Sequence, residues 1–149
     1  MSAEKSLRIL IVEDEILIAL ELENLLQDEG HDVVGMAASS KQALTLGRDL
    51  TPDLAFVDIH LADGPTGVDV ARHFTNELGI TVLFMTANAK RIPDDCAGAR
   101  GVIAKPYTER GVREALAYVM AEQDEEQPNR TMTFVPFGAL SREDSSSLS

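Results

Sequence analysis

The sequence predicts an α/β fold, a doubly wound parallel sheet of five strands with helices on both faces. Two observations support this prediction. Short apolar runs alternate with helical patterns over about 120 residues, which implies βαβ units with right-handed crossovers. The chain also has 149 residues, of which 44% are hydrophobic. That length and composition suit one globular unit with its own core.

Four apolar runs are too uniformly hydrophobic to be half-exposed strands, and we expect them to be buried on both faces. They are residues 7–12, 54–57, 80–85 and 101–104. Residues 32–37 form a weaker fifth candidate. The expected architecture is a flavodoxin-like (βα)5 sandwich whose parallel sheet has the strand order 2-1-3-4-5.

The clearest helical pattern follows the first strand. Its apolar residues recur at helical spacing, at Ile18, Leu22, Leu25 and Leu26, so they are expected to share one face. Gly30 follows as the expected C-cap, because glycine adopts the left-handed conformation that ends many helices.

Capping residues predict the next two helices. Ser39 or Ser40 can cap a second helix that runs to about Leu50, because a serine hydroxyl accepts from a free backbone N–H of the first turn. A third helix is expected over residues 68–78, after a loop rich in glycine and proline.

The region between the fourth and fifth strands is different. Residues 88–99 are weakly periodic and contain Pro93, so any helix there is expected to be short or mobile. Thr108 is the expected N-cap of the last helix. One face of that helix carries Val112, Ala115, Leu116 and Val119.

Chemically active side chains stand at the carboxyl ends of the predicted strands, which is where doubly wound sheets place their functional sites. They are Glu13 and Asp14, then Asp58, Thr86 and Lys105. Three acids so close repel one another, and a divalent cation would neutralise them. Carboxylate ligands without Cys or clustered His favour Mg²⁺, which also leaves room for phosphate oxygens.

These residues predict an aspartyl-phosphate site. An Asp can attack phosphorus when a metal and cationic donors offset the charge on the phosphoryl oxygens. Asp58 is the best candidate for the phosphoacceptor because its strand is central, and Glu13 and Asp14 are better placed to hold the metal. Lys105 would pair with one phosphoryl oxygen, and the Thr86 hydroxyl would donate to another.

The ordered set VEDE, VDIHL, TA and AKP resembles the receiver domain of two-component response regulators, over residues 6–122. The resemblance implies transfer of a phosphoryl group from the phosphohistidine of a sensor histidine kinase, or of a phosphotransfer protein, to Asp58. It also implies a phosphoprotein that is not an enzyme beyond its self-catalysed phosphotransfer and autodephosphorylation.

The same resemblance implies a ligand set. Mg²⁺ would be held by Asp14, Asp58 and the main-chain carbonyl of His60, with Glu13 assisting through water. A cis peptide bond is implied before Pro106, because X–Pro bonds lose little free energy in the cis form.

Several positions depart from the usual receiver pattern. Val102 stands where receivers carry the aromatic residue that follows the phosphorylated state, and Tyr107 could report that state or only pack. The stretch from Thr86 to Lys105 is short, which leaves little fourth helix. This combination, with FMTA at residues 84–87, is similar to an atypical branch of single-domain regulators in alphaproteobacteria. Our hypothesis is that such a chain signals by ordering a loose segment over residues 88–99.

Two other classes of protein fit part of the pattern. A haloacid-dehalogenase-like phosphatase also uses Asp, Thr, Lys and Mg²⁺, but its nucleophile ends the first strand in a DxDxT motif, and here His60 replaces the second acid. A flavodoxin-like electron carrier needs a hydroxyl-rich and glycine-rich loop after the first strand, where this chain has Glu13 and Asp14. Both are less favoured than the receiver.

The receiver interpretation leaves the output open between a phosphate sink and an adaptor that binds a partner protein. Resemblance places receiver partner binding or homodimer formation on the fourth helix, fifth strand and fifth helix. The net charge of −12 would repel phosphate backbones and anionic lipids, so neither nucleic acid nor a membrane is an expected partner.

The remaining signals concern location and domain organisation. A single cysteine, Cys96, allows no internal disulfide, and no export signal is visible, so a cytoplasmic setting is expected. The receiver domain is expected to span residues 1–122. Residues 123–149 form an acidic, serine-rich tail expected to be disordered. An apolar segment over residues 131–140 is either a docking segment, for a partner or for the domain itself, or an inert remnant, and docking is favoured because exposed Phe134 and Phe137 would otherwise be a liability.

Overall fold

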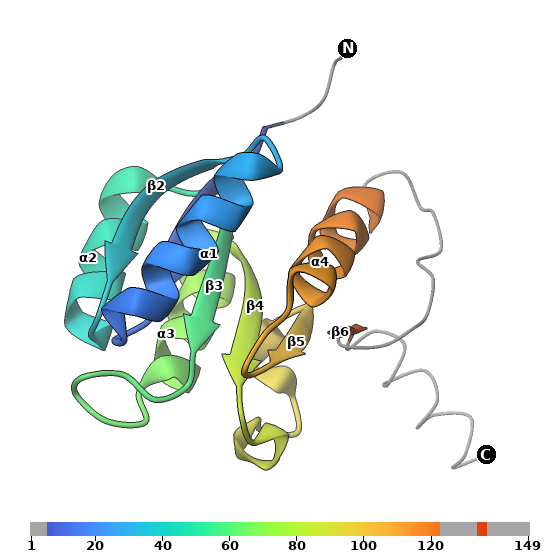
Figure 1. The fold of residues 1–149 in the computed structure, drawn as a ribbon. Helices are drawn as coiled ribbons and strands as arrows, with labels where there is room; N and C mark the ends of the chain where they lie inside the picture. The colour runs from blue at the N-terminus through green and yellow to red at the C-terminus, as the bar shows by residue number, and fades with distance from the viewer. Residues whose placement is uncertain (1–5, 123–133, 137–149) are drawn as a thin grey trace.

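The computed structural model describes residues 6–122 and 134–136. Their strands form one sheet in the order β2-β1-β3-β4-β5-β6 (Figure 1). The first five strands are parallel, and β6 is antiparallel to β5. The strands are β1 Arg8–Val12, β2 Asp32–Ala37, β3 Leu54–Asp58, β4 Thr81–Thr86, β5 Gly101–Ala104 and β6 Phe134–Pro136. The predicted order 2-1-3-4-5 is confirmed, and β6 extends it at the edge beyond β5.

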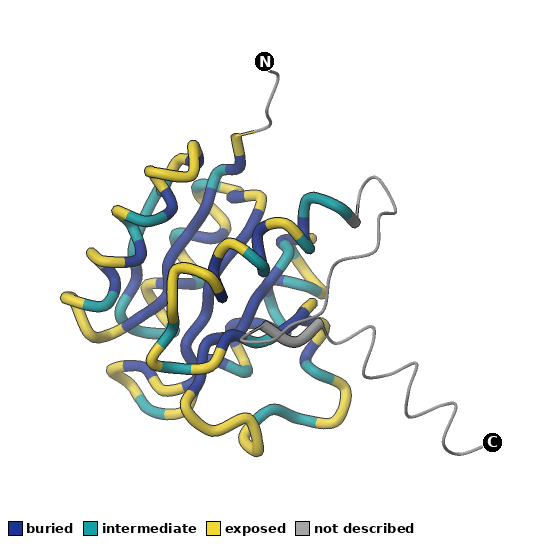
Figure 2. Tube along the Cα trace, turned by 45° about the vertical axis from the view of Figure 1, so that its right-hand side comes forward, coloured by how far each residue is buried: buried dark blue, intermediate teal, exposed yellow. Residues whose placement is uncertain are grey.

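Helices cover both faces of this sheet. They are α1 Ile16–Asp28, α2 Ser40–Leu50, α3 Gly67–His73 and α4 Glu109–Glu122. Helices α1 and α4 pack on the face that carries Phe56, and α2 and α3 pack on the face that carries Val57. Because successive strand residues point to opposite faces, the central strands contribute to both cores and are buried along their length (Figure 2).

The predicted caps are present in three of the helices. Ser39 caps α2, and its hydroxyl accepts from the Gln42 N–H at 3.2 Å. The Thr108 hydroxyl accepts from the Gly111 N–H at 2.9 Å, which caps α4. Gly30 follows α1 with a φ of +92°, a conformation that glycine adopts without steric cost.

The buried face of α1 is slightly displaced from the predicted one. Leu22 and Leu26 are buried as predicted, together with Ala19, whereas Ile18 and Leu25 lie half-buried at the margin. The first helical turn follows directly on the acidic residues after β1, so the start of α1 lies beside the strand ends (Figure 1).

The third helix has the predicted extent but changes type along its length. After α3 the chain continues as a π-helical turn over Phe74–Leu78. Phe74 is fully buried against α2 at Gly47, where a Cβ atom would lie 2.5 Å from the ring. Only glycine at position 47 therefore leaves room for this ring.

Between β4 and β5 the chain forms two 3-10 turns, η2 Ala89–Arg91 and η3 Cys96–Gly98, in place of an α-helix. The prediction of a short helical region is confirmed. Pro93 lies between the turns, and Cys96 and Ala97 have positive φ values of 58° and 50°, which no continuous right-handed helix contains.

Two contacts hold this segment to α3 and the π-helical turn. The Arg72 guanidinium lies 2.6 Å from an Asp95 carboxylate oxygen, and the Thr75 hydroxyl donates to the Ala97 carbonyl at 3.0 Å. The segment is therefore attached to the neighbouring element in addition to the hydrogen bonds of its own turns.

Of the tail, only β6 belongs to the described residues, and it falls within the predicted apolar segment 131–140. The tail residues 123–133 and 137–149, and with them the rest of the predictions made for the tail, lie outside the described part of the chain. Within residues 6–122 and 134–136, the search for a helix long and apolar enough to span a bilayer finds none.

Candidate functional site

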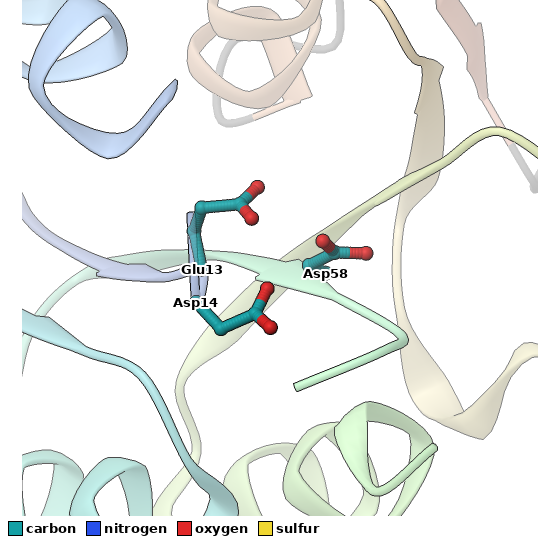
Figure 3. A group of neighbouring side chains, drawn as sticks. All are labelled: Glu13, Asp14 and Asp58. Atoms are coloured by element: carbon teal, nitrogen blue, oxygen red, sulfur yellow. The ribbon is translucent and has the colours of Figure 1, made fainter. Parts of the chain in front are cut away.

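Three acidic side chains converge at the carboxyl end of the sheet. Asp58 is the last residue of β3, and Glu13 and Asp14 directly follow β1, the neighbouring parallel strand. Carboxylate oxygens of all three lie within 4.8 Å of one another (Figure 3). Parallel pairing of β1 with β3 brings these strand ends level, so the sheet itself produces the cluster.

A lysine joins two of these acids. Lys105 follows β5, and its ammonium lies 2.8 Å from Asp58 Oδ2 and 3.0 Å from Glu13 Oε1. The exposed fraction of the side chain is 15% for Lys105, 9% for Asp58 and 0% for Glu13. Little water reaches these charges, so the one ammonium offsets two carboxylates across a poorly screened distance.

Burial perturbs the protonation of this group. Burial raises the pKa of Glu13 to about 7, although the Glu15 N–H and the Lys105 ammonium both donate to its carboxylate and act to lower it. Burial would lower the pKa of Lys105, but its hydrogen bonds to Asp58 and Glu13 outweigh this, and the pKa is raised. The lysine is therefore a fixed positive charge at neutral pH.

Thr86 ends β4 next to the acids and is buried. Its hydroxyl accepts from the Asn88 N–H at 3.0 Å and donates to the Asn88 carbonyl at 3.3 Å. The hydroxyl is thus held by the backbone that leaves the strand. It would have to exchange this partner to donate to a group on Asp58.

The backbone of Asp58 is packed against the start of α3. The Gly67 N–H donates to the Ile59 carbonyl at 2.9 Å, and a Cβ atom at position 67 would lie 2.1 Å from the Asp58 carbonyl oxygen. Any side chain there would displace the strand end. The sequence marked Gly67 only as part of a loop, since the requirement arises from a tertiary approach that composition does not reveal.

The loop after β3 is fastened by an acid that the sequence did not single out. Asp63 accepts from the Ser40 hydroxyl at 2.6 Å and the Thr66 hydroxyl at 2.8 Å. These hydrogen bonds lower the pKa of Asp63 to about 2. The loop that follows Asp58 is therefore tied to the first residue of α2.

The donor set fits a hard divalent cation. Among the described residues, Glu13, Asp14 and Asp58 are the one group of potential ligands whose atoms cluster, and all of these atoms are carboxylate oxygens. Asp14 is exposed and could take up an ion from solvent. Mg²⁺ prefers such ligands and retains several waters.

The histidines lie outside this ligand group. The side chain of His60 is exposed, and its backbone N–H donates to Asp58 Oδ1 over a long distance of 3.4 Å. His31 accepts from the Leu7 N–H at 3.0 Å through Nδ1, which makes it part of the core.

The predicted switch positions take different environments. Val102 is half-buried in β5 and pairs with Phe84 in β4 on one side and with Val135 in β6 on the other. The Tyr107 hydroxyl donates to the Ile18 carbonyl of α1 at 3.2 Å, and burial raises its pKa to about 12. The peptide bond before Pro106 is cis.

An apolar patch, defined here as Ile16, Leu17 and Leu20, lies on the first turns of α1. Their exposed fractions are 61%, 73% and 42%. The spacing of Ile18, Leu22, Leu25 and Leu26 predicts only the inward face of this helix. The unbroken run ILIAL, apolar all round the first turns, is the signal that could have indicated the patch.

Comparisons with known proteins identify the domain. A family model described as "Response regulator receiver domain" matches residues 9–117. The chain is 32% identical over 122 residues to the phyllosphere-induced regulator PhyR of Methylorubrum extorquens, covering 80% of this chain and 46% of that protein. It is 31% identical over 104 residues to the transcriptional regulatory protein PdtaR of Mycobacterium tuberculosis, covering 68% of this chain and 50% of that protein.

Solved structures agree with these matches. The solution structure of the PhyR receiver domain of Erythrobacter litoralis has a TM-score of 0.72 and 33% identity, and the match covers 85% of this chain and 96% of that one. PhyR of Brucella abortus has a TM-score of 0.66 and 32% identity, over 80% of this chain and 51% of that one. The chain thus spans about half the length of the curated relatives it matches.

Proposed function

This chain belongs to the response regulator receiver domain family of two-component signalling, and we propose on that premise that Asp58 accepts a phosphoryl group. The observation that supports the proposal is the contact of Asp58 with Lys105 at 2.8 Å, inside a cluster of acids at the end of a central strand. Neither the family model nor the relatives named above favour a haloacid-dehalogenase-like phosphatase.

The proposed donor is the phosphohistidine of a sensor kinase or of a phosphotransfer protein. A carboxylate oxygen of Asp58 forms a bond to phosphorus, the phosphorus–nitrogen bond breaks, and the histidine nitrogen keeps the electron pair. Oδ2 is engaged by Lys105, whereas Oδ1 has only a long contact of 3.4 Å to the His60 N–H. Oδ1 is therefore the oxygen more available for attack.

Several residues around Asp58 would offset the negative charge on the transferred phosphoryl group. Lys105 pairs with one phosphoryl oxygen, and the Thr86 hydroxyl, released from Asn88, donates to another. Glu13, Asp14, Asp58 and the His60 carbonyl would hold Mg²⁺, which when bound offsets the negative charge of the acids and of the phosphoryl oxygens.

We expect the donor protein to dock on the apolar patch. Ile16, Leu17 and Leu20 are exposed on the helix that starts two residues after Asp14. A partner that covers this patch would bring its histidine close to the strand ends and would exclude water from the reaction. Sensor kinases carry out this chemistry in the cytoplasm, which is where we place the protein.

Two outputs follow from the proposal. As an adaptor, the phosphorylated chain would bind a partner protein that the unmodified chain does not bind. As a phosphate sink, it would only drain phosphoryl groups from the kinase. In both, the chain makes and hydrolyses its own aspartyl phosphate and acts on no other substrate.

The test is labelling by a small acyl phosphate in the presence of Mg²⁺, followed by intact mass spectrometry of wild type and Asp58→Asn. The wild type is expected to gain one phosphoryl group, and the variant none. Asp63→Asn is the matched control, because it removes an acid from the adjoining loop, and it should label like the wild type. Equal labelling of wild type and Asp58→Asn would overturn the proposal.

A further inference from the structure

The β5 edge of the receiver sheet is covered by the chain's own tail. Antiparallel pairing places Gly101 opposite Pro136, Val102 opposite Val135 and Ile103 opposite Phe134 (Figure 1). Without β6, the outer N–H and C=O groups of β5 would be an open template for another strand. β6 also lies against α4, so the tail strand joins two elements.

The strand that β6 covers leads directly into the site. β5 ends at Ala104, and Lys105, whose ammonium contacts Asp58, is the next residue. The Lys105 N–H also donates to the Thr86 carbonyl at 3.0 Å. Any movement of Lys105 and Thr86 toward a phosphoryl group therefore pulls on the end of a four-residue strand, three positions of which pair with β6.

The pairing of β5 with β6 includes position 102, where this chain has valine in place of the aromatic residue of most receivers. Val102, which stands where most receivers carry an aromatic residue, has Val135 of β6 as its partner. A strand that pairs there can respond to a displacement of β5 without a rotating aromatic side chain.

We propose that β6 is the readout element of this receiver: it caps the β5 edge while Asp58 is unmodified and leaves that edge when Asp58 is phosphorylated. The inference rests on the proposed function. The ligand of the β5 edge is the segment Phe134–Pro136 of this chain, and its release opens the edge to an extended apolar segment of an output partner.

The short length of β6 makes release feasible. Its ladder contains three residue pairs, and Pro136, at its end, has no N–H to donate. β6 belongs to the same chain as β5, so its pairing is intramolecular and needs little intrinsic affinity. A strand with weak intrinsic affinity can thus be paired in one state and unpaired in the other.

The first test uses the full chain with beryllium trifluoride and Mg²⁺ as the phosphoryl mimic. Amide hydrogen exchange is measured in peptides that cover residues 101–104 and 134–136. We expect protection to fall severalfold in both when the mimic is added, and to stay constant in Asp58→Asn. Unchanged or increased protection, in a chain whose Asp58 is labelled by an acyl phosphate, would refute the inference and leave the proposed function standing. A wild-type chain that takes up no label refutes the proposed function itself.

The second test uses reciprocity, because a mimic that weakens β6 pairing must bind more tightly when that pairing is lost. Val135→Pro removes a backbone N–H from the middle of β6, and Ser141→Pro is the control outside that strand. We expect Val135→Pro, and independently the double variant Phe134→Gly with Val135→Gly, to bind the mimic about fivefold more tightly than the control. Equal affinity in variants whose exchange shows β6 to be unpaired would contradict the coupling.

Discussion

The acidic end of the site, which consists of Glu13, Asp14 and Asp58 with the Lys105 ammonium, differs in burial from the segment between β4 and β5. Glu13 and Asp58 are buried, stand at the ends of central strands, and share the Lys105 ammonium. The segment over residues 88–100 consists of two 3-10 turns, and most of its residues before Cys96 are exposed. Its end is anchored by Ala97 and Ala99, which are buried in the core, beside the exposed ion pair Arg72–Asp95 and a hydrogen bond from Thr75.

This difference shows how the chemical groups and a more exposed connection can be separated within one fold. Glu13 and Asp58 stand at buried strand ends whose backbone is fixed by the whole sheet, so their carboxylates stay in place. Exposed connections open at a lower free-energy cost than buried strands, and residues 88–91, 94 and 95 of this segment are exposed. We expect substitutions in the acidic end to abolish chemistry, and those in the 88–100 segment to alter only dynamics.

The largest effect is expected from Lys105→Met. It removes the charge that contacts Asp58 and would pair with the transferred phosphoryl group, and loss of one such donor lowers a rate by about 10²–10³. Labelling by an acyl phosphate should slow by this factor. Lys90→Met, at an exposed position in η2, should label normally. A labelling rate for Lys105→Met within about twofold of the wild-type rate would contradict the role of Lys105 in phosphoryl transfer.

A smaller effect is expected from the metal. Mg²⁺ at ten times its dissociation constant should raise the free energy of unfolding by about 1.4 kcal/mol, because it binds only the folded acid cluster. Asp14→Asn should lose most of this gain in a urea titration. Asp69→Asn, an exposed acid outside the cluster, should keep it. Identical gains in the two variants would place the ion elsewhere.

The segment between β4 and β5 is tested by Thr75→Val. Losing the hydrogen bond to the Ala97 carbonyl should cost about 1 kcal/mol and speed amide exchange over residues 88–99, while Asp58 labels at the wild-type rate. Thr45→Val, on the exposed side of α2, is the control. If labelling of Asp58 slowed while amide exchange became faster, the segment between β4 and β5 would be coupled to the chemistry, which contradicts the expected independence of the two regions. The same exchange experiment, with and without a phosphoryl mimic, tests our hypothesis that phosphorylation orders these residues.

The smallest effect concerns the loop after β3. Its hydrogen bonds lower the pKa of Asp63 from 3.8 to about 2, so the folded state favours the ionised form. The stabilisation is complete above the ordinary pKa and is lost as pH falls through the folded value. Asp63→Ala should therefore be slightly less stable than the wild type at pH 7, and the difference should shrink as pH falls toward 2 and vanish below it, measured by urea titration. Asp32→Ala is the exposed control, and a difference that persisted at low pH would point to packing instead.

Much of this architecture was predictable because it depends on local patterns. Buried parallel strands are apolar throughout, so their existence and ends could be predicted, and the ends place Glu13, Asp58 and Lys105 together. The strand order 2-1-3-4-5 followed from the expected fold class. The weak periodicity around Pro93 likewise predicted a short or mobile helix, and the structure has two 3-10 turns there.

The features that escaped prediction depend on tertiary contacts. Gly67 is required by the approach of α3 to the Asp58 carbonyl, and the π-helical turn at Phe74–Leu78 has no signature in the periodicity of the chain. The apolar tail segment was recognised, but antiparallel pairing of Phe134 and Val135 with β5 is set by a free sheet edge far away in sequence.

The central claim is that Asp58, and no other residue, carries the phosphoryl group. After labelling with an acyl phosphate and Mg²⁺, borohydride reduces an aspartyl phosphate to homoserine, and peptide sequencing by mass spectrometry locates it. We expect homoserine at position 58 alone, with none in a sample that was not labelled. Homoserine at Asp14 or at another acid, or its absence from a chain that gained a phosphoryl group, would contradict the claim.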